Sequence, residues 1–256
     1  MGLVITGNLV TVDHSIVDWM LTDVVGNPTL ENFDGLNVHV VFKRTLPDAK
    51  SRRLKRKTKS IRGDNCPIIY ALKGKDGLIT NYTSIKLLSN SFNSITMDIT
   101  KLYHTEYDFI VPMPSSSPLS TIIATRLAKI FKAPICNDYF KKITIEDAYK
   151  LLDRADLSVE DEKSLSYRLK KAKEEVGFFG SLPMKSIPTK YRQAFPPLVY
   201  DKAMAGKFTD KKVLLVDDLL ATGTTLKCAR DLLVGNNRPE LVKGICLIGS
   251  FGKAKR

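Results

Sequence analysis

Two adjacent carboxylates follow a short apolar run, and a small, hydroxyl-rich loop comes after them, separated from them by two leucines. The apolar run covers residues 213–216, the carboxylates are Asp217 and Asp218, and the loop covers residues 221–225. The pattern predicts a buried strand whose carboxyl end carries the two acids, which is where ligands bind in open α/β sheets. The amides of the loop and of a following helix N-terminus would form a site for a phosphate dianion.

Gly223 lets the backbone approach a phosphate closely, and the neighbouring threonine hydroxyls can donate further hydrogen bonds. Acids beside a phosphate site would repel it unless they bound something else, and ribose hydroxyls with a magnesium ion are the natural partners. The alternative is that Asp217 and Asp218 only cap the loop and that the threonines cap the helix. The chain contains no G-x-x-x-x-G-K-[ST] loop.

The thirteen residues VLLVDDLLATGTT (213–225) resemble the motif with which type I phosphoribosyltransferases bind 5-phosphoribosyl-1-pyrophosphate (PRPP). The resemblance implies that Asp217 and Asp218 hold the ribose hydroxyls as the catalytic acids, with Mg²⁺ bound nearby and only indirectly. It implies that the 5′-phosphate is held by Ala221, Thr222, Gly223, Thr224 and Thr225.

A second segment occupies the place of the pyrophosphate-binding loop of that family. In VPMPSSS (111–117), the residues Ser115, Ser116 and Ser117 offer amides and hydroxyls without bulk. A plain strand-to-helix turn is the alternative.

Basic residues elsewhere in the chain could complete the pyrophosphate site. Lys190 and Arg192, with Lys185 nearby, could close over the departing pyrophosphate and stabilise its charge, and Lys73 is a further candidate. Solvated surface charges are the alternative for each of them.

A fainter similarity extends to the competence-related ComF-like branch of the family. It rests on YALKG (70–74), on VPMP (111–114) and on YRQAF (191–195). Two features of that branch are missing, because there is no cysteine-rich zinc ribbon at the start and SSSPLS replaces the arginine-rich loop after VPMP.

Ala221 stands where related purine-salvage enzymes carry a carboxylate beside the base, and alanine cannot transfer a proton. Either the acceptor is already a good nucleophile, or the base comes from elsewhere, or no transfer occurs. Two functions follow. The first is transfer of ribose 5-phosphate from PRPP to an unidentified nitrogen acceptor in nucleotide metabolism, with release of pyrophosphate. The second is a non-catalytic PRPP or nucleotide sensor, or an effector subunit of a nucleic-acid system such as competence or antiphage defence.

The net charge of +13 has one concentrated source, which we call the basic arm, residues 43–62. It holds ten basic residues and one acid, whereas residues 1–42 contain no Lys or Arg. Such a run is commonly a solvated loop, but it also attracts nucleic acid. The candidate contacts are Arg52, Arg53, Lys55, Arg56 and Lys57.

The apolar patterns predict strands over residues 3–12, 36–43, 213–216 and 244–248, and a buried strand within DFIVPMP (108–114). Further predictions are a helix from residue 119, a strand near 134–136, a charged helical stretch between about 144 and 190 and a helix after 225. We therefore expect an α/β fold, with a mainly parallel sheet flanked by helices, an N-terminal β-containing extension and a helical insertion. The expected division is an extension over 1–62, including the basic arm, and a phosphoribosyltransferase-like domain over 63–256.

Composition indicates a cytoplasmic protein without a membrane span. The hydrophobic fraction of 43% is ordinary for a globular chain, and no apolar run approaches the roughly 20 residues that cross a bilayer. The four cysteines form no C-x-x-C pair, so reduced thiols are expected. A homo-oligomer or a protein complex is compatible with the sequence.

Overall fold

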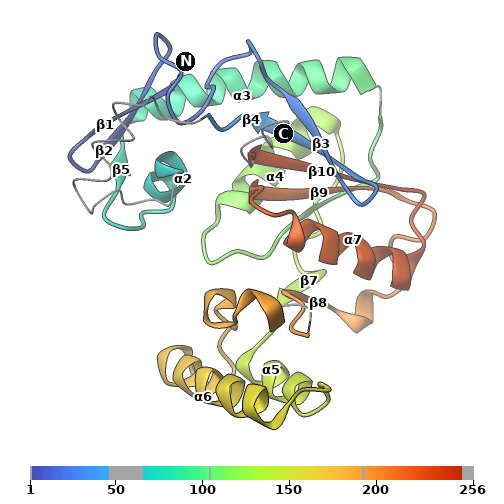
Figure 1. Ribbon diagram of the computed structural model, residues 1–256. Coiled ribbons are helices and arrows are strands. Elements are labelled where there is room, and N and C mark those ends of the chain that lie inside the picture. The colour runs from blue at the N-terminus through green and yellow to red at the C-terminus, as the bar shows by residue number, and fades with distance from the viewer. Residues whose placement is uncertain (1, 46–65, 104, 192–193, 250–256) are drawn as a thin grey trace, which may run out of the picture.

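A five-stranded sheet forms the centre of the computed structural model, which describes residues 2–45, 66–103, 105–191 and 194–249 (Figure 1). Its strand order is β3 (Thr29–Phe33), β4 (Leu36–Phe42), β10 (Leu241–Ile248), β9 (Lys212–Leu219) and β6 (Phe109–Pro112). All neighbours run parallel except β3, which pairs antiparallel with β4 at one edge. The predicted α/β class with a mainly parallel sheet is therefore confirmed.

Helices cover both faces of this sheet because its central strands are apolar on both sides. The helices α2 (Pro67–Leu72), α3 (Tyr82–Tyr103) and α4 (Leu119–Phe131) share one core with Leu214 and Val216 of β9. The helix α7 shares the other core with the residues of β9 that alternate with these. α7 covers Thr224–Asn237, and the alternating residues are Val213 and Leu215.

The predicted single strand over residues 3–12 is wrong. The chain forms the hairpin β1 (Gly2–Thr6) and β2 (Leu9–Asp13), which are antiparallel, and β2 also pairs with β5 (Ile79–Thr80). A two-residue Gly7-Asn8 turn reverses the chain, with Gly7 at a φ of 61°. Gly-Asn is a turn signal for a hairpin, and it outweighs the continuous apolar pattern around it.

The predicted strand near residues 134–136 is reduced to one bridge between Ile135 and Ile110. In contrast, β9 and β10 are longer than predicted, at eight residues each. The helices expected from residue 119 and after residue 225 are confirmed as α4 and α7. The sequence patterns had not indicated β3 or the long helix α3.

The charged stretch between 144 and 190 forms a separate helical lobe, which we define as residues 143–191 together with Ala194 and Phe195. It contains α5 (Ile145–Leu152), α6 (Val159–Val176) and two short 3-10 helices, around a core of its own that includes Leu165 and Leu169. In Figure 1 it lies below the central sheet, joined through β7 (Phe140–Lys142) and β8 (Leu198–Tyr200). This confirms the helical insertion.

The N-terminus of α6 is capped by a side chain. Ser158 is the N-cap, and its Oγ accepts a hydrogen bond from the backbone N–H of Asp161 at 3.2 Å. The short 3-10 helices of the lobe are Met184–Ser186 and Thr189–Tyr191, and a third, Lys202–Met204, follows β8.

Strands from both sides of the basic arm take part in the central sheet, since β4 pairs with β10. The division of the chain at residue 62 stays a prediction. None of the described helices combines the length and the apolar character that a membrane crossing requires.

Candidate functional site

The two acids lie at the carboxyl end of β9, as the sequence predicts. The strand alternation turns them to opposite faces of the sheet, so that Asp218 is buried and Asp217 is half-buried. The backbone N–H of Asp218 donates to Oδ1 of Asp217 at 2.8 Å. Met113, just after β6, donates its N–H to the carbonyl of Val216 at 2.7 Å. This places residues 115–117, which we call the serine loop, beside the acid pair.

Asp218 is held by an ion pair that joins two distant parts of the chain. Nζ of Lys73, just after α2, lies 2.6 Å from Oδ2 of Asp218, and the two side chains are 14% and 6% exposed. Oγ of Ser120, in the first turn of α4, lies 3.4 Å from the same oxygen. A predicted ribose-binding acid and a predicted pyrophosphate-binding lysine therefore share one contact.

The carboxyl group of Asp217 has a shifted pKa. Burial, followed by the negative charge of Asp218, raises the pKa of Asp217 to about 7. The N–H of Asp218 and the ammonium groups of Lys73 and Lys142 lower that pKa in part. Ribose hydroxyls donating to this carboxyl group, or a cation beside it, would favour its ionised form.

Three lysines, Lys73, Lys75 and Lys142, gather around the acids, and we call them the lysine cluster. Nζ of Lys75 donates to Oγ of Ser116 at 3.1 Å. Burial and the positive charges of Lys75 and Lys73 lower the pKa of Lys142, whereas Asp217 and Asp218 oppose that shift. Cations held close together beside a serine loop form a site for a polyanion.

The loop after β9 is arranged for the close approach of an anion. Gly223 is the N-cap of α7 in the left-handed region, at a φ of 72°, and no side chain caps this helix. A Cβ at this position would meet Cδ1 of Phe33 at 2.7 Å, so β3 closes the space behind the loop. The hydroxyls of Thr222 and Thr224 lie 2.9 Å apart. The first amides of α7 are therefore free of side-chain caps, as a phosphate site requires.

The remaining members of this loop are open to ligands to different degrees. Ala221, Thr222 and Thr224 are exposed, and Thr225 is half-buried.

The serine loop divides into two parts. Ser115 and Ser116 are exposed, whereas Ser117 is buried and its Oγ accepts from the N–H of Leu119 at 3.3 Å. The first two serines can therefore meet a ligand, and Ser117 supports the start of α4.

The structure does not bring all predicted residues together. Lys190 lies in the helical lobe, where its Nζ is 3.4 Å from Oδ1 of Asp161 and 4.3 Å from the ring centre of Tyr191. Its role at the pyrophosphate stays a prediction. Arg192 lies outside the described residues, as do the five candidate nucleic-acid contacts of the basic arm, Arg52, Arg53, Lys55, Arg56 and Lys57.

Sequence reasoning missed Lys75, Lys142, Ser120 and Phe33. Lys75 stands two residues after Lys73, and this spacing could have indicated that both lysines belong to the same site. Lys142 and Phe33 come from strands far away in the chain, and no local pattern marks them.

The described residues hold no group of three or more His, Cys, Asp or Glu that could bind a metal by itself. Two carboxylates beside a polyphosphate site are nevertheless a suitable environment for Mg²⁺, which commonly takes one or two protein carboxylates and completes its shell with phosphates and water. The acid pair therefore fits an indirectly held Mg²⁺.

The fold and this site define a phosphoribosyltransferase-like α/β protein. The phosphoribosyl transferase domain family matches residues 105–256, and the chain belongs to that family. Strand β4 of the central sheet and Lys73 and Lys75 of the lysine cluster lie before the matched region.

Two curated relatives share a short region with the chain. The bifunctional protein PyrR of Alkaliphilus metalliredigens (strain QYMF) is 42% identical over 52 residues, which are 20% of this chain and 29% of that protein. The bifunctional protein PyrR of Acetivibrio thermocellus is 40% identical over 52 residues, which are 20% of this chain and 28% of that protein. The chain thus matches less than a third of the length of these relatives.

Solved structures give a more distant likeness. A purine phosphoribosyltransferase from Pyrococcus horikoshii has 14% identity and a TM-score of 0.31, covering 62% of this chain and 85% of that chain. The protein TT1426 from Thermus thermophilus has 14% identity and a TM-score of 0.32, covering 62% of this chain and 81% of that chain. Assignment to the ComF-like branch stays a prediction.

Proposed function

We propose that this chain transfers ribose 5-phosphate from PRPP to a nitrogen acceptor and releases pyrophosphate. The observation that carries the proposal is the acid pair at the end of β9, flanked by the uncapped N-terminus of α7 and by the lysine cluster. The 5′-phosphate would bind the loop from Ala221 to Thr225, and the ribose hydroxyls would donate to Asp217 and Asp218.

In the reaction, the acceptor nitrogen forms a bond to C1 of the ribose while the bond from C1 to the pyrophosphate oxygen breaks. The electron pair of that bond leaves with the pyrophosphate. The transition state carries positive charge on the ribose, which the acid pair stabilises, and increasing negative charge on the leaving group. Bound Mg²⁺ would supply additional positive charge to the pyrophosphate oxygens.

Lys73 links the two halves of this site. Ribose hydroxyls that occupy Asp218 would compete with its ion pair, and the freed ammonium group would lie beside the pyrophosphate. Lys75 and Ser116 would bind the pyrophosphate on the side of the serine loop. The loss of Lys73 should therefore impair the release of pyrophosphate more than the binding of the 5′-phosphate.

The test is incubation with PRPP, Mg²⁺ and a panel of nitrogenous bases, with pyrophosphate release as the readout. The double variant Asp217→Asn, Asp218→Asn should lose Mg²⁺-dependent PRPP binding and turnover but keep its fold, because both side chains lie at a strand end. Each charged hydrogen bond removed is worth about 1.5–3 kcal/mol. Lys150→Gln, on the helical lobe, is the matched control. Retention of full PRPP affinity by the double variant would contradict the site assignment.

Ala221 favours a second candidate, a PRPP sensor without transfer, because its methyl group occupies the exposed position where a proton-transferring carboxylate would stand. A sensor binds PRPP but turns over no acceptor. In calorimetry its PRPP affinity should change when nucleic acid is added, because binding linkage is reciprocal. Rapid turnover with no affinity for nucleic acid would exclude the sensor.

A further inference from the structure

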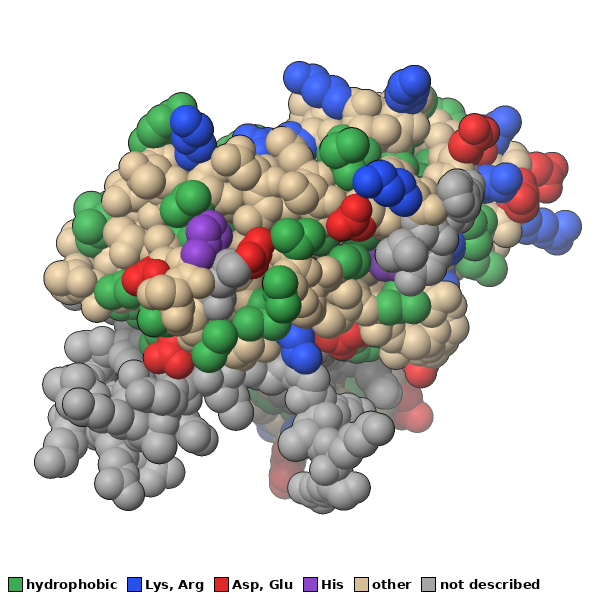
Figure 2. Space-filling model, turned by 90° about the horizontal axis from the view of Figure 1, so that it is seen from above, with side chains coloured by type: hydrophobic (Ala, Val, Ile, Leu, Met, Phe, Trp, Pro, Cys, Tyr) green, Lys and Arg blue, Asp and Glu red, His purple; other side chains and the backbone are tan. Residues whose placement is uncertain are grey.

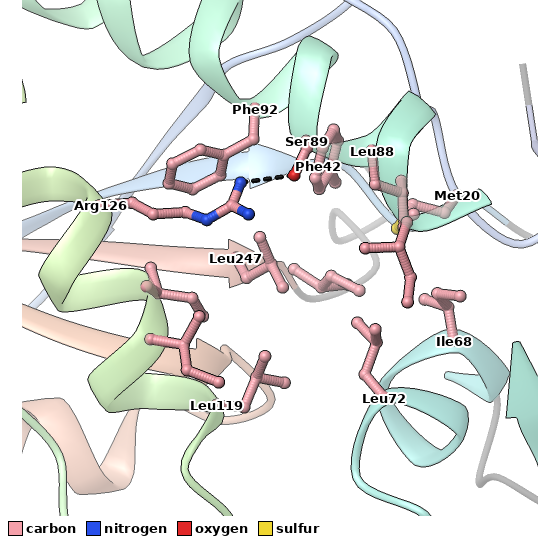
Figure 3. A pocket seen from close by; sticks show the side chains of 14 residues that line it. Met20, Phe42, Ile68, Leu72, Leu88, Ser89, Phe92, Leu119, Arg126 and Leu247 are labelled. Carbon is pink, nitrogen blue, oxygen red and sulfur yellow. Dashed lines mark hydrogen bonds between the residues drawn. The ribbon is translucent and has the colours of Figure 1, made fainter. Parts of the chain in front are cut away.

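A pocket of about 260 Å³ lies on the face of the central sheet opposite α7. It is enclosed by α2, α3 and α4 and by the ends of β4 and β10 (Figure 3). The phosphate loop leads into α7 on the other face, so this pocket is distinct from the proposed 5′-phosphate site. Leu72 and Leu119 in its wall directly precede Lys73 and Ser120, the two contacts of Asp218.

The lining is apolar with one polar edge. Every lining side chain is hydrophobic except those of Ser89 and Arg126, and none of the described residues that line the pocket is acidic. A guanidinium nitrogen of Arg126, on α4, donates to Oγ of Ser89, on α3, at 2.5 Å, and Figure 3 shows this bond bridging the two helices. Arginine has five N–H donors, so others are available to an anion.

The pocket is open to solvent on the same side as this polar edge. Ile85 on α3 and Ile122 on α4 are 39% and 49% exposed, whereas Phe42 and Ile68 deeper in the pocket are buried. A ligand could therefore place an apolar body among the buried side chains and keep a charged group near Arg126. On the face seen in Figure 2, the Lys and Arg side chains of the described residues are scattered among acidic, hydrophobic and other side chains.

We infer that this pocket binds a small apolar carboxylate, with its hydrocarbon or aromatic body inside and its carboxylate on Arg126. The volume is slightly below the ~300–1,000 Å³ of sites for drug-sized ligands, so it fits a molecule of about ten to fifteen non-hydrogen atoms. A guanidinium pairs with a carboxylate by two parallel hydrogen bonds, which selects this group over a neutral amide. The inference does not depend on whether the chain catalyses transfer.

The test compares 4-phenylbutyrate with 4-phenylbutanamide, which have the same size and differ in charge. Calorimetry should find one 4-phenylbutyrate bound per chain with a Kd on the order of 1 mM, as expected for about twelve non-hydrogen atoms. The amide should bind about tenfold more weakly, because it lacks the charge-assisted hydrogen bonds.

Two variants locate the site, and a third serves as the control. Arg126→Gln should make the affinities for the two compounds equal, and Ile122→Trp should fill the mouth and abolish binding of both. Lys129→Gln removes a cation from the same helix outside the pocket and should change neither affinity. Thermal unfolding checks that each variant folds, and PRPP binding should be unchanged in all three.

The inference is overturned if wild-type protein binds the acid and the amide equally, or if neither compound binds at several times the expected Kd. Unchanged binding in Ile122→Trp would also overturn it, because the compound would then occupy another site. Loss of turnover in every protein with binding of 4-phenylbutyrate intact would contradict only the proposed function.

Discussion

The ion pair between Lys73 and Asp218 offers a test of how much the candidate site contributes to stability. Two unit charges 2.6 Å apart attract each other by about 6 kcal/mol at an effective dielectric constant of about 20. Desolvation offsets much of this attraction, because only 14% of the lysine side chain and 6% of the aspartate side chain are exposed. Removing one partner, however, leaves the other charge buried and unpaired.

We therefore expect Lys73→Met to lower the free energy of unfolding by about 3 kcal/mol at neutral pH, at the lower end of the range for a broken buried pair. Asp218→Asn should cost less, about 1–2 kcal/mol, because the long lysine stem lets the ammonium group reach water. The double variant Lys73→Met, Asp218→Asn should be more stable than Lys73→Met alone, since the carboxylate that lost its partner is removed as well. Equilibrium urea unfolding of the four proteins measures these differences.

A second ion pair serves as the matched control. Lys150 and Glu146 on α5 lie 2.8 Å apart, but their side chains are 59% and 33% exposed. The same double-mutant cycle there should give a coupling energy several times smaller, because solvent screens exposed charges. Equal coupling energies in the two cycles, or additive effects of Lys73→Met and Asp218→Asn, would refute the argument from burial.

Three further predictions concern the phosphate loop, the core and the basic arm. Gly223→Ala should weaken PRPP binding at least tenfold in calorimetry. A non-glycine residue in the left-handed region costs about 1–2 kcal/mol, and its Cβ would meet Phe33. Unchanged PRPP affinity would show that this loop is not part of the binding site. Burial, followed by the positive charge of Lys243, lowers the pKa of His39 to about 4, so the unfolded state binds more protons below about pH 6.5. Acidification from neutral pH to about pH 4 should therefore lower the free energy of unfolding by about 3 kcal/mol. The variant His39→Leu should not show this decrease when its free energy of unfolding is measured over the same pH range. Neutralising the five candidate contacts of the basic arm should reduce the slope of log affinity for nucleic acid against log salt concentration by about 0.7–0.9 per lost phosphate contact, and PRPP binding should stay unchanged. Loss of PRPP binding with unchanged nucleic-acid affinity would place the arm at the active site.

Local sequence patterns were sufficient for the parts of the site that lie within one short segment. The apolar run before Asp217 predicted a buried strand, and the small residues after Asp218 predicted a turn into a helix with free amides. Both are present in β9 and α7, because an apolar run buried on both faces and a glycine at positive φ are determined within a few residues. The cap of α6 at Ser158 is likewise determined within a few residues.

The secondary-structure prediction was wrong or incomplete where local signals conflicted or were weak. The apolar residues over 3–12 predicted one strand, although the Gly7-Asn8 turn within that range makes the segment a hairpin. The antiparallel edge strand β3 was missed because only Leu30 and Phe33 of its five residues are apolar.

The partners of the acids were beyond the sequence alone. Lys73, Lys142 and Ser120 lie between about 75 and 145 residues from Asp218 along the chain, and they come close to it only because the folded chain brings their segments to the carboxyl end of β9. Charge and burial at that edge, which raise the pKa of Asp217, depend on this convergence. The sequence by itself therefore determined the strand, the position of the acids at its end and the loop over residues 221–225. Only the tertiary structure decided which cations face those acids and that an apolar pocket lies across the sheet from α7, because both require contacts between segments far apart in the chain.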